Sequence, residues 1–334
     1  MSDQRYVRQL LIENWDQNKL NESTATIVGL GALGTVAAAS LAMAGVSTLI
    51  LVDYDTIEMS NLNRQLFYRP LDVGSTKVEI CEKILKNINP NIDIKPFNRH
   101  IEKVPHHELE SSTVILEGLD TFQTRRWVNS FCAAKKVPLV SGGMYSFLGN
   151  VQVIIPEKSP CLECQSLIPE EELQKACTPF GEIRKKERSQ EIQDEIIPSV
   201  SSVSFVIGGL MAQEALKIMM KLPPLKEYLF WDGRAGIFTS VLLKRRDDCI
   251  VCSPKFKLKA ILIRSPKDQS IKDFGTQLRY SFNLSSDLFI LYKTKKLSLS
   301  KKKIGKVFSE DAIFRVIDPS LSFPLKFQIV LDQE

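Results

Sequence analysis

The stretch Thr24-Ala-Thr-Ile-Val-Gly-Leu-Gly-Ala-Leu-Gly34 decides the fold of this chain. Its apolar part predicts a buried strand over Ala25–Val28, and its small residues predict a helix over residues 35–44. The turn between them carries three glycines, Gly29, Gly31 and Gly34. Such glycines let a nucleotide approach the backbone and let the helix pack closely on a sheet. The stretch predicts a Rossmann-like α/β fold, although this glycine pattern alone would favour a dehydrogenase.

Polar and basic residues beyond the second predicted strand change that interpretation. This strand, Leu49–Val52, is followed directly by Asp53, at the distance from the last glycine where a carboxylate can bind ribose hydroxyls. Four residues then follow for which a dehydrogenase has little need: Asn61, Arg64, Gln65 and Lys77. An enzyme that attacks a triphosphate needs such groups, because fixed cations stabilise the charge that develops on phosphate oxygens.

A further carboxylate follows the predicted strand Thr113–Leu116. Asp120 would lie at the carboxyl edge of the sheet, where open α/β folds bind their ligands. A carboxylate at that edge can hold Mg²⁺ between phosphates. We therefore expect Asp120 to take part in catalysis as a magnesium ligand, with Asp55 and Arg125 as supporting groups around the site.

Length and composition favour a soluble, cytoplasmic protein with one large α/β domain and a small companion. The chain has 334 residues and a net charge of +5. It has no apolar run long enough to span a membrane, and the segment Met1 to Leu20 lacks the apolar core of a signal peptide. Seven cysteines in such a chain suggest metal binding or catalysis rather than a disulfide framework.

Alternating apolar runs and helical stretches over residues 24–155 predict a mostly parallel sheet. Besides the three strands above, we expect strands at Asp93–Phe97, Pro138–Ser141 and Val151–Ile155, and an antiparallel pair at Tyr228–Trp231 and Gly236–Leu243. Residues 1–20 suit an outer helix, and Val200–Met220 suits a long buried one. Between Gln165 and Pro198 mixed charge replaces the apolar pattern, which predicts an exposed connection.

Four of the cysteines form two Cys-x-x-Cys pairs that lie far apart in the sequence: Cys161 with Cys164, and Cys249 with Cys252. Four thiolates make a closed tetrahedral zinc site with no position left for water, and hence a structural one. Two redox pairs or disulfides are the alternatives. Cys81 and Cys132 lie on apolar faces of predicted helices and suit the core.

Three segments together resemble the adenylation domain of ubiquitin-activating enzymes and of the bacterial relatives that activate molybdopterin-synthase and thiamine sulfur carriers. They are Arg5-Tyr6-x-Arg8-Gln9, Asn61-Leu62-x-Arg64-Gln65 and the Lys77 segment, within a resemblance that spans Arg5 to Cys252. The resemblance implies ATP and Mg²⁺ as cofactors, contacted by Asp53, Arg64, Lys77 and Asp120. It also implies that Arg8 reaches the ATP of a partner protomer, and hence a homodimer.

Cys177, in Ala-Cys-Thr-Pro, resembles the thioester-forming cysteine of enzymes that activate ubiquitin-like modifiers. The resemblance implies that this catalytic thiolate attacks an acyl-adenylate and leaves a transferable thioester. Larger family members carry a folded domain around this cysteine, whereas this chain has only a short segment there. An incidental surface cysteine is the alternative.

The C-terminal residues 257–334 suit a small second domain. Strands are expected at Leu258–Ile263, Leu288–Tyr292, Ala312–Ile317 and Leu325–Leu331, with a helix at Ile271–Phe282. Strands wrapped about one helix look like a β-grasp, the ubiquitin fold, which in ubiquitin activators recruits the conjugating enzyme. This segment has 15 Lys and Arg against 8 Asp and Glu, a net charge of +7 that leaves −2 for the remainder. Without interleaved aromatic residues, a docking or solvated face is favoured over nucleic-acid binding.

The sequence thus predicts an enzyme with an adenylation domain (1–164 and 198–256), a catalytic-cysteine crossover segment (165–197) and a ubiquitin-fold domain (257–334). We expect it to adenylate a ubiquitin-like protein that ends in Gly-Gly, to form a thioester on Cys177 and to pass it to a conjugating enzyme. An adenylyltransferase for a sulfur carrier, with no thioester relay, is the nearest alternative. A non-catalytic scaffold and a dehydrogenase are more distant ones.

Overall fold

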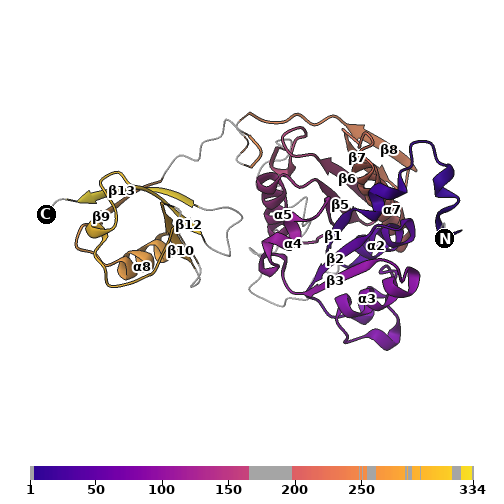
Figure 1. The fold of residues 1–334 in the computed structure, drawn as a ribbon, viewed down its shortest axis with the longest axis horizontal. Coiled ribbons are helices and arrows are strands. Elements are labelled where there is room, and N and C mark those ends of the chain that lie inside the picture. Colours follow the sequence, from indigo (N-terminus) through magenta and orange to yellow (C-terminus); the bar gives the residue numbers. More distant parts are fainter. Residues whose placement is uncertain are drawn as a thin grey trace. The chain divides into compact units, whose positions relative to one another are not determined.

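The computed structural model describes residues 4–164, 198–247, 249, 251–253, 261–282, 284, 288–293, 295–317 and 325–332, apart from three side chains (Phe122, Gln123 and Phe289). The chain divides into two compact units, Met1–Ser253 and Pro254–Glu334. Figure 1 shows the helices and strands of each. Cys177 and the rest of the predicted crossover segment lie outside the described residues.

An eight-stranded sheet in the order β3-β2-β1-β4-β5-β6-β7-β8 forms the frame of the first unit. Its strands are β1 (Thr24–Val28), β2 (Thr48–Asp53), β3 (Asp93–Asn98), β4 (Val114–Glu117), β5 (Leu139–Tyr145), β6 (Leu148–Ile154), β7 (Tyr228–Asp232) and β8 (Ile237–Val241). β3 to β5 are parallel in this order, and β6 to β8 continue the sheet antiparallel. The predicted Rossmann-like, mostly parallel sheet is confirmed.

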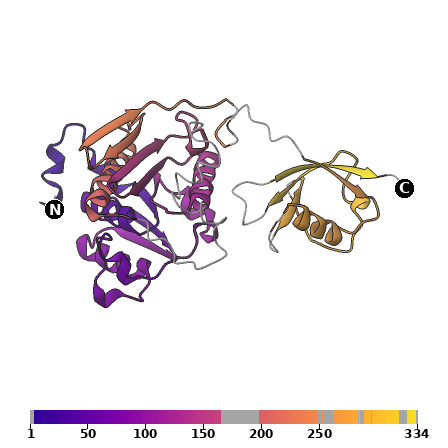
Figure 2. The same cartoon turned by 180° about the vertical axis from the view of Figure 1, so that it is seen from behind.

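Helices cover both faces of this sheet, and each face has its own apolar core. One core includes residues of α2 (Ala32–Ala44), α3 (Lys77–Ile88) and α7 (Ser201–Met219). The other includes residues of α4 (His106–Glu110) and α5 (Phe122–Lys135). Figures 1 and 2 show these two helical layers on opposite sides of the strands. Cys81 and Cys132 are fully buried, as expected of small core residues.

Helix α7 is long and apolar enough to cross a membrane, a test that the core helix of a globular unit also passes. Here it packs against α2 and the sheet. A Cβ on Gly208 would lie 2.9 Å from the carbonyl oxygen of Leu33 on α2, and one on Gly142 of β5 would lie 2.2 Å from Sδ of Met211. Such close approaches assign α7 to the core, as its continuous hydrophobicity predicted.

The N-terminal segment, residues 4–20, forms less helix than we expected. It contains two short 3₁₀ turns, Gln4–Tyr6 and Gln9–Leu11, and α1 extends only over Gln17–Asn21. Asn14 has a left-handed backbone, with φ of 63°, which a continuous helix does not allow. α1 begins after it, where the Asp16 side chain accepts hydrogen bonds from the first turn.

The second unit is a five-stranded sheet in the order β11-β10-β12-β13-β9 that packs on one helix. Its elements are β9 (Ile261–Pro266), α8 (Ile271–Phe282), β10 (Phe289–Tyr292), β11 (Lys295–Leu297), β12 (Ile313–Ile317) and β13 (Leu325–Asp332). The first and last strands lie side by side and parallel, and the other pairs are antiparallel. Strands around a single helix were expected. The short lysine-rich β11 was not, because it has no apolar alternation to predict it.

Candidate active site and cysteine cluster

Three strand ends meet at one edge of the large sheet. Val28 of β1 lies opposite Val52 of β2 on one side and Glu117 of β4 on the other. The strand order reverses at β1, because β2 and β3 continue to one side and β4 to the other. Open α/β sheets bind ligands at such a switch point. The segments that follow these strands carry the glycine turn, Asp53 and Asp120, which the fold therefore brings to one edge.

The glycine turn after β1 leaves the start of α2 open. Gly29 has φ of +86°, and a Cβ on Gly34 would lie 1.8 Å from the Gly29 carbonyl oxygen, so both positions require glycine. Gly31 precedes α2, where no described side chain caps the helix and the first turn has no acidic residue. The free N–H groups and positive dipole of such a helix start suit an anion, phosphate above all.

Asp53 at the end of β2 holds the glycine turn in place. Its Oδ2 accepts a hydrogen bond from the N–H of Leu30 at 2.6 Å, and its Oδ1 accepts one from the N–H of Asp55 at 2.8 Å. Burial raises the pKa of this carboxyl, and the positive charge of Lys77 opposes that shift. Each oxygen keeps a lone pair, so the carboxylate can also accept hydrogen bonds from ribose hydroxyls.

Two cations lie near this edge. Lys77, the first residue of α3, is almost buried, and its Nζ lies 2.7 Å from Oδ2 of Asp55. Arg64 donates to the carbonyl oxygen of Ser60 at 2.6 Å. Burial lowers the pKa of this guanidinium, whereas the negative charge of Asp120 raises it. Asp120 itself is exposed, and its carboxylate has no hydrogen-bond or ion-pair partner among the described residues.

Asn61 and Gln65 are both buried but differ in what they bind. The Asn61 side chain accepts a hydrogen bond from the N–H of Glu58 at 3.1 Å and so shapes its own loop. Oε1 of Gln65 has no partner in the part of the chain that the structure describes, and a Cβ on Gly31 would lie 3.8 Å from the Gln65 Nε2. Gln65 therefore lies beside the glycine turn with an acceptor that a ligand could use.

Arg8 lies in a segment that is attached at the opposite end of α2 from these groups. Its neighbours are attached near the carboxyl end of α2: Gln9 donates to the carbonyl oxygen of Ala44 at 2.9 Å, and the Tyr6 ring lies against Gly45. The nucleotide edge lies at the other end of α2, which at 13 residues is about 20 Å long. The Arg8 side chain is exposed and has no hydrogen-bond or ion-pair partner among the described residues.

A buried ion pair that the sequence analysis missed supports the segment 118–121 between β4 and α5, which we call the Asp120 turn. Glu117 is fully buried. Its Oε2 accepts hydrogen bonds from Nε of Arg125 at 3.0 Å and from the N–H of Leu119 at 3.3 Å. Its Oε1 accepts one from the Ser141 hydroxyl. Arg125 also donates to the carbonyl oxygen of Gly142. One carboxylate therefore connects the Asp120 turn, α5 and β5. The signal in the sequence was a glutamate that ends an apolar strand.

Tyr68 was also missed. Its hydroxyl donates to the carbonyl oxygen of Leu30 at 2.6 Å and lies 3.3 Å from Sγ of Cys81. Burial raises the pKa of Cys81 to about 12. The glycine turn is thus held by its N–H at Asp53 and by its carbonyl at Tyr68.

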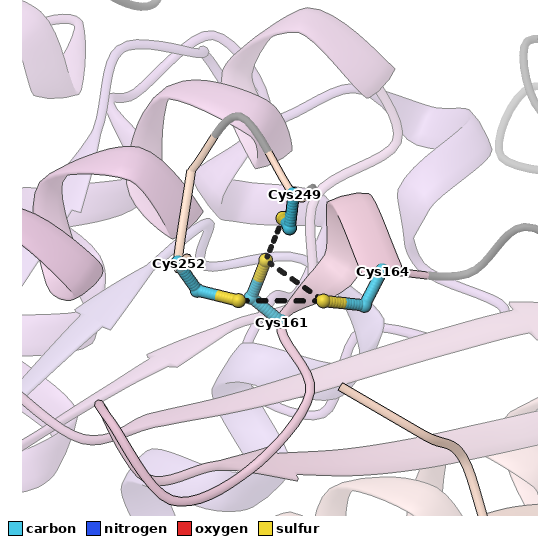
Figure 3. A group of neighbouring side chains, drawn as sticks. All are labelled: Cys161, Cys164, Cys249 and Cys252. Carbon is cyan, nitrogen blue, oxygen red and sulfur yellow. Dashed lines mark hydrogen bonds between the residues drawn. The ribbon is translucent and has the colours of Figure 1, made fainter. Parts of the chain in front are cut away.

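The four cysteines of the two Cys-x-x-Cys pairs converge, as Figure 3 shows. All four sulfur atoms lie within 4.8 Å of one another, with Cys161 at 3.5 Å from Cys249 and Cys164 at 3.3 Å from Cys252. These distances exceed the roughly 2.05 Å of a disulfide. They fit a tetrahedral ion, since zinc–sulfur bonds of about 2.3 Å place thiolates about 3.8 Å apart. The cluster can therefore hold zinc.

Helix α5 contacts the first half of this cluster. Arg126 forms a two-pronged ion pair with Glu163, which lies between Cys161 and Cys164. The side-chain oxygen of Asn129 accepts a hydrogen bond from the N–H of Leu162 at 3.2 Å. The adjacent Arg125 binds Glu117. Two neighbouring arginines of α5 therefore bind Glu163, between the first two cysteines, and Glu117, which supports the Asp120 turn.

Comparison with known proteins agrees with this geometry. The ThiF family matches residues 6–251. The chain is 34% identical to the Molybdopterin-synthase adenylyltransferase of Escherichia coli, over 75% of this chain and 98% of that protein. It is 31% identical to the Sulfur carrier protein ThiS adenylyltransferase of the same organism, over 74% and 94%.

More distant matches include the Ubiquitin-like modifier-activating enzyme 5 of Arabidopsis thaliana, 25% identical over 79% of this chain and 63% of that protein. The fold resembles a crystal structure of E. coli MccB with succinimide, with a TM-score of 0.62 and 24% identity over 75% of each chain. The relatives at 31% and 34% identity are named for sulfur carriers or molybdopterin synthase, which favours the alternative of the sequence analysis over its main interpretation. Because the family matches residues 6–251 and two adenylyltransferases are 31% and 34% identical to the chain, the chain belongs to the ThiF family of E1-like adenylyltransferases.

Proposed function

We propose that the first unit uses ATP to adenylate the C-terminal carboxylate of a small sulfur-carrier or ubiquitin-like protein. The observation that carries the proposal is the single sheet edge that gathers an uncapped helix start, Asp53, Lys77, Arg64 and Asp120. Membership in the ThiF family gives ATP as the cosubstrate. The identity of its relatives makes a sulfur carrier the substrate that we favour.

Each residue of the site has a role that follows from its chemistry. The start of α2 would receive phosphate oxygens, and Asp53 would accept hydrogen bonds from ribose hydroxyls. Asp120, which is exposed, would hold Mg²⁺, which supplies charge neutralisation between phosphates. Arg64 and Lys77 would stabilise the negative charge that grows when the carrier's carboxylate attacks the α-phosphorus and the bond to pyrophosphate breaks. The contact with the Asp55 carboxylate holds the Lys77 ammonium in place.

Exchange of labelled pyrophosphate into ATP, measured with a carrier protein that ends in Gly-Gly, tests this function. Exchange should need the carrier and should fall at least about a hundredfold in Asp120→Asn and Lys77→Ala, as loss of a transition-state contact implies. Lys135→Ala, which removes an exposed ion pair with Glu110, is the matched control and should leave exchange unchanged. Full exchange by Asp120→Asn would contradict the assignment.

We further propose that Arg8 acts on the ATP of a partner protomer in a homodimer. The attachment of its segment at the far end of α2 supports action in trans, because α2 places about 20 Å between that attachment and the nucleotide edge of the same protomer. Mixing two inactive variants, Arg8→Ala and Lys77→Ala, should restore activity. Half of the mixed dimers are heterodimers with one intact site each, so about a quarter of wild-type activity is expected. No restoration after subunit exchange would contradict action in trans.

A thioester on Cys177, passed to a conjugating enzyme, is the second candidate function. Two features favour it: the Cys177-Thr178 sequence, and the second unit, which lies beyond the part matched to relatives that are covered over 94% and 98% of their length. A non-reducing gel with ATP, Mg²⁺ and the carrier tests it. An adduct that thiols remove and that Cys177→Ala lacks would support the relay. Exchange without any such adduct would leave the adenylate as the end product.

A further inference from the structure

The second unit has one sheet face covered by α8 and one that α8 leaves open. Side chains alternate along the strands, and the inward ones, such as Phe314 and Ile329, are buried with Phe274 of the helix. The outward ones include Leu262, which is 67% exposed, and Ile313, which is 50% exposed. These outward residues form a surface whose composition can be read from the strand register.

Basic side chains line up across this outer face. Lys326 of β13 lies directly opposite Arg315 of β12, which lies opposite Leu291 of β10, which lies opposite Lys296 of β11. With strands about 4.8 Å apart, the row is about 14 Å long. Arg264 of β9 adds a further exposed cation on the same face.

This alignment works against the stability of the sheet. Like charges directly opposite each other destabilise a strand pair. The side chains of Arg315 and Lys326 have no hydrogen bond or ion pair to any residue that the structure describes. The sequence adds no acidic residue between Leu288 and Ser309, although it places seven lysines there. The stability of the sheet therefore does not account for such a row.

Apolar side chains next to the row indicate the kind of partner. Leu262 and Ile313 lie on either side of Gln328 in the adjacent cross-strand row. The Gln328 amide donates to Asp311 at the margin, at 3.1 Å. Protein interfaces combine an apolar centre with a polar rim. Single-stranded nucleic acid instead needs aromatic platforms, and the aliphatic Leu262 and Ile313 supply none.

We propose that this basic sheet face, made of Leu262, Arg264, Ile313, Arg315 and Lys326, docks a protein whose contacting surface carries Asp and Glu carboxylates around exposed aliphatic side chains. The carboxylates pair with Arg264, Arg315 and Lys326, and the aliphatic groups cover Leu262 and Ile313. The proposal holds for either substrate considered above, because it depends on the second unit alone.

Fluorescence anisotropy of the full chain with a labelled helical peptide of Glu, Leu and Ala tests the proposal. A Lys-for-Glu version of the peptide and a single-stranded oligonucleotide of equal charge serve as comparison probes. The acidic peptide should bind, and more weakly as salt rises. Its affinity should fall about tenfold in Arg315→Glu/Lys326→Glu, as the loss and reversal of two ion pairs implies.

Two further variants make the test specific for the position. Lys301→Glu/Lys302→Glu changes the net charge equally on an exposed loop of the same unit and should lower the affinity less than about threefold. Leu262→Ser/Ile313→Ser keeps the charge and should lower it about fivefold, because apolar area is no longer buried. Equal losses in both charge variants, tighter binding of the oligonucleotide through Arg315 and Lys326, or no binding of the acidic peptide would overturn the proposal.

Discussion

Removal of the buried Glu117 carboxylate is the perturbation for which the structure makes the sharpest prediction. Its partner Arg125 has a side chain only 8% exposed, so Glu117→Leu removes the carboxylate that pairs with this buried guanidinium. Breaking a buried ion pair on one side costs about 3–5 kcal/mol. The Ser141 hydroxyl and the Leu119 N–H lose their acceptor as well. We therefore expect the first unit to lose at least about 3 kcal/mol of unfolding free energy.

Urea unfolding followed by tryptophan fluorescence measures this loss in one unit only. The three tryptophans, Trp15, Trp127 and Trp231, all lie in the first unit. In the double variant Glu117→Leu/Arg125→Met both charges are gone, so at least about 2 kcal/mol should return. Lys135→Ala, which breaks a pair that is 41% exposed on each side, should cost at most about 1 kcal/mol.

Two results would refute the reasoning. One is a Glu117→Leu loss below about 1 kcal/mol, which is the range of an exposed pair. The other is a double variant that is less stable than the single one, since the penalty would then not come from the broken Glu117–Arg125 pair.

Three further changes have directions that follow from the same contacts. Gly34→Ala places a Cβ 1.8 Å from the Gly29 carbonyl oxygen, so it should cost about 1–3 kcal/mol and weaken ATP binding in calorimetry; unchanged affinity would show that the turn can relax. Cys164→Ser should lower the zinc content in a colorimetric assay and the Tm by about 5–10 °C, whereas Cys132→Ala should retain zinc; full zinc in Cys164→Ser would argue against a four-cysteine site. The pKa of Cys81 rises from 9.0 to about 12 on folding, so the unfolded state loses its proton first and stability falls as pH rises through this window. In urea unfolding, the wild type should lose about 1.4 kcal/mol per pH unit above pH 9 relative to Cys81→Ala. A stability difference that does not change with pH would mean that the pKa of the thiol is not shifted.

The elements of the fold were predictable because their signals are local. The apolar run Ala25–Val28 and the small residues after Gly34 can hardly form anything other than a strand and a close-packed helix. The outer helix expected over residues 1–20 was wrong, because it depended on scattered apolar positions and overlooked the left-handed Asn14. The strand β11 was missed for the opposite reason, since its pairing with β10 is tertiary and its own sequence is mostly lysine.

The positions of the candidate site residues were predictable only where a motif or a strand end marked them. Asp53, Lys77 and Asp120 follow strand ends or open a helix, so topology alone brings them to one edge. Their supports were not predictable in this way. Glu117 meets Arg125, and Tyr68 meets Leu30, through contacts that depend on side-chain direction and on packing between elements far apart in sequence. Asp55 and Arg125 were expected as supporting groups, but their partners could not be named from spacing.

The packing of α7 against α2 and the sheet has a consequence for a chain that is cut between residues 165 and 197. This helix comes after residues 165–197, yet it packs against α2, and β7 pairs with β6 from before that segment. The cysteine cluster joins the same two portions, with Cys161 and Cys164 on one and Cys249 and Cys252 on the other. A chain severed once between 165 and 197 would therefore remain a single particle under native conditions. Two polypeptides, 1–164 and 198–334, are natural halves for complementation, and a chelator would show whether a metal ion at the cluster contributes to their association.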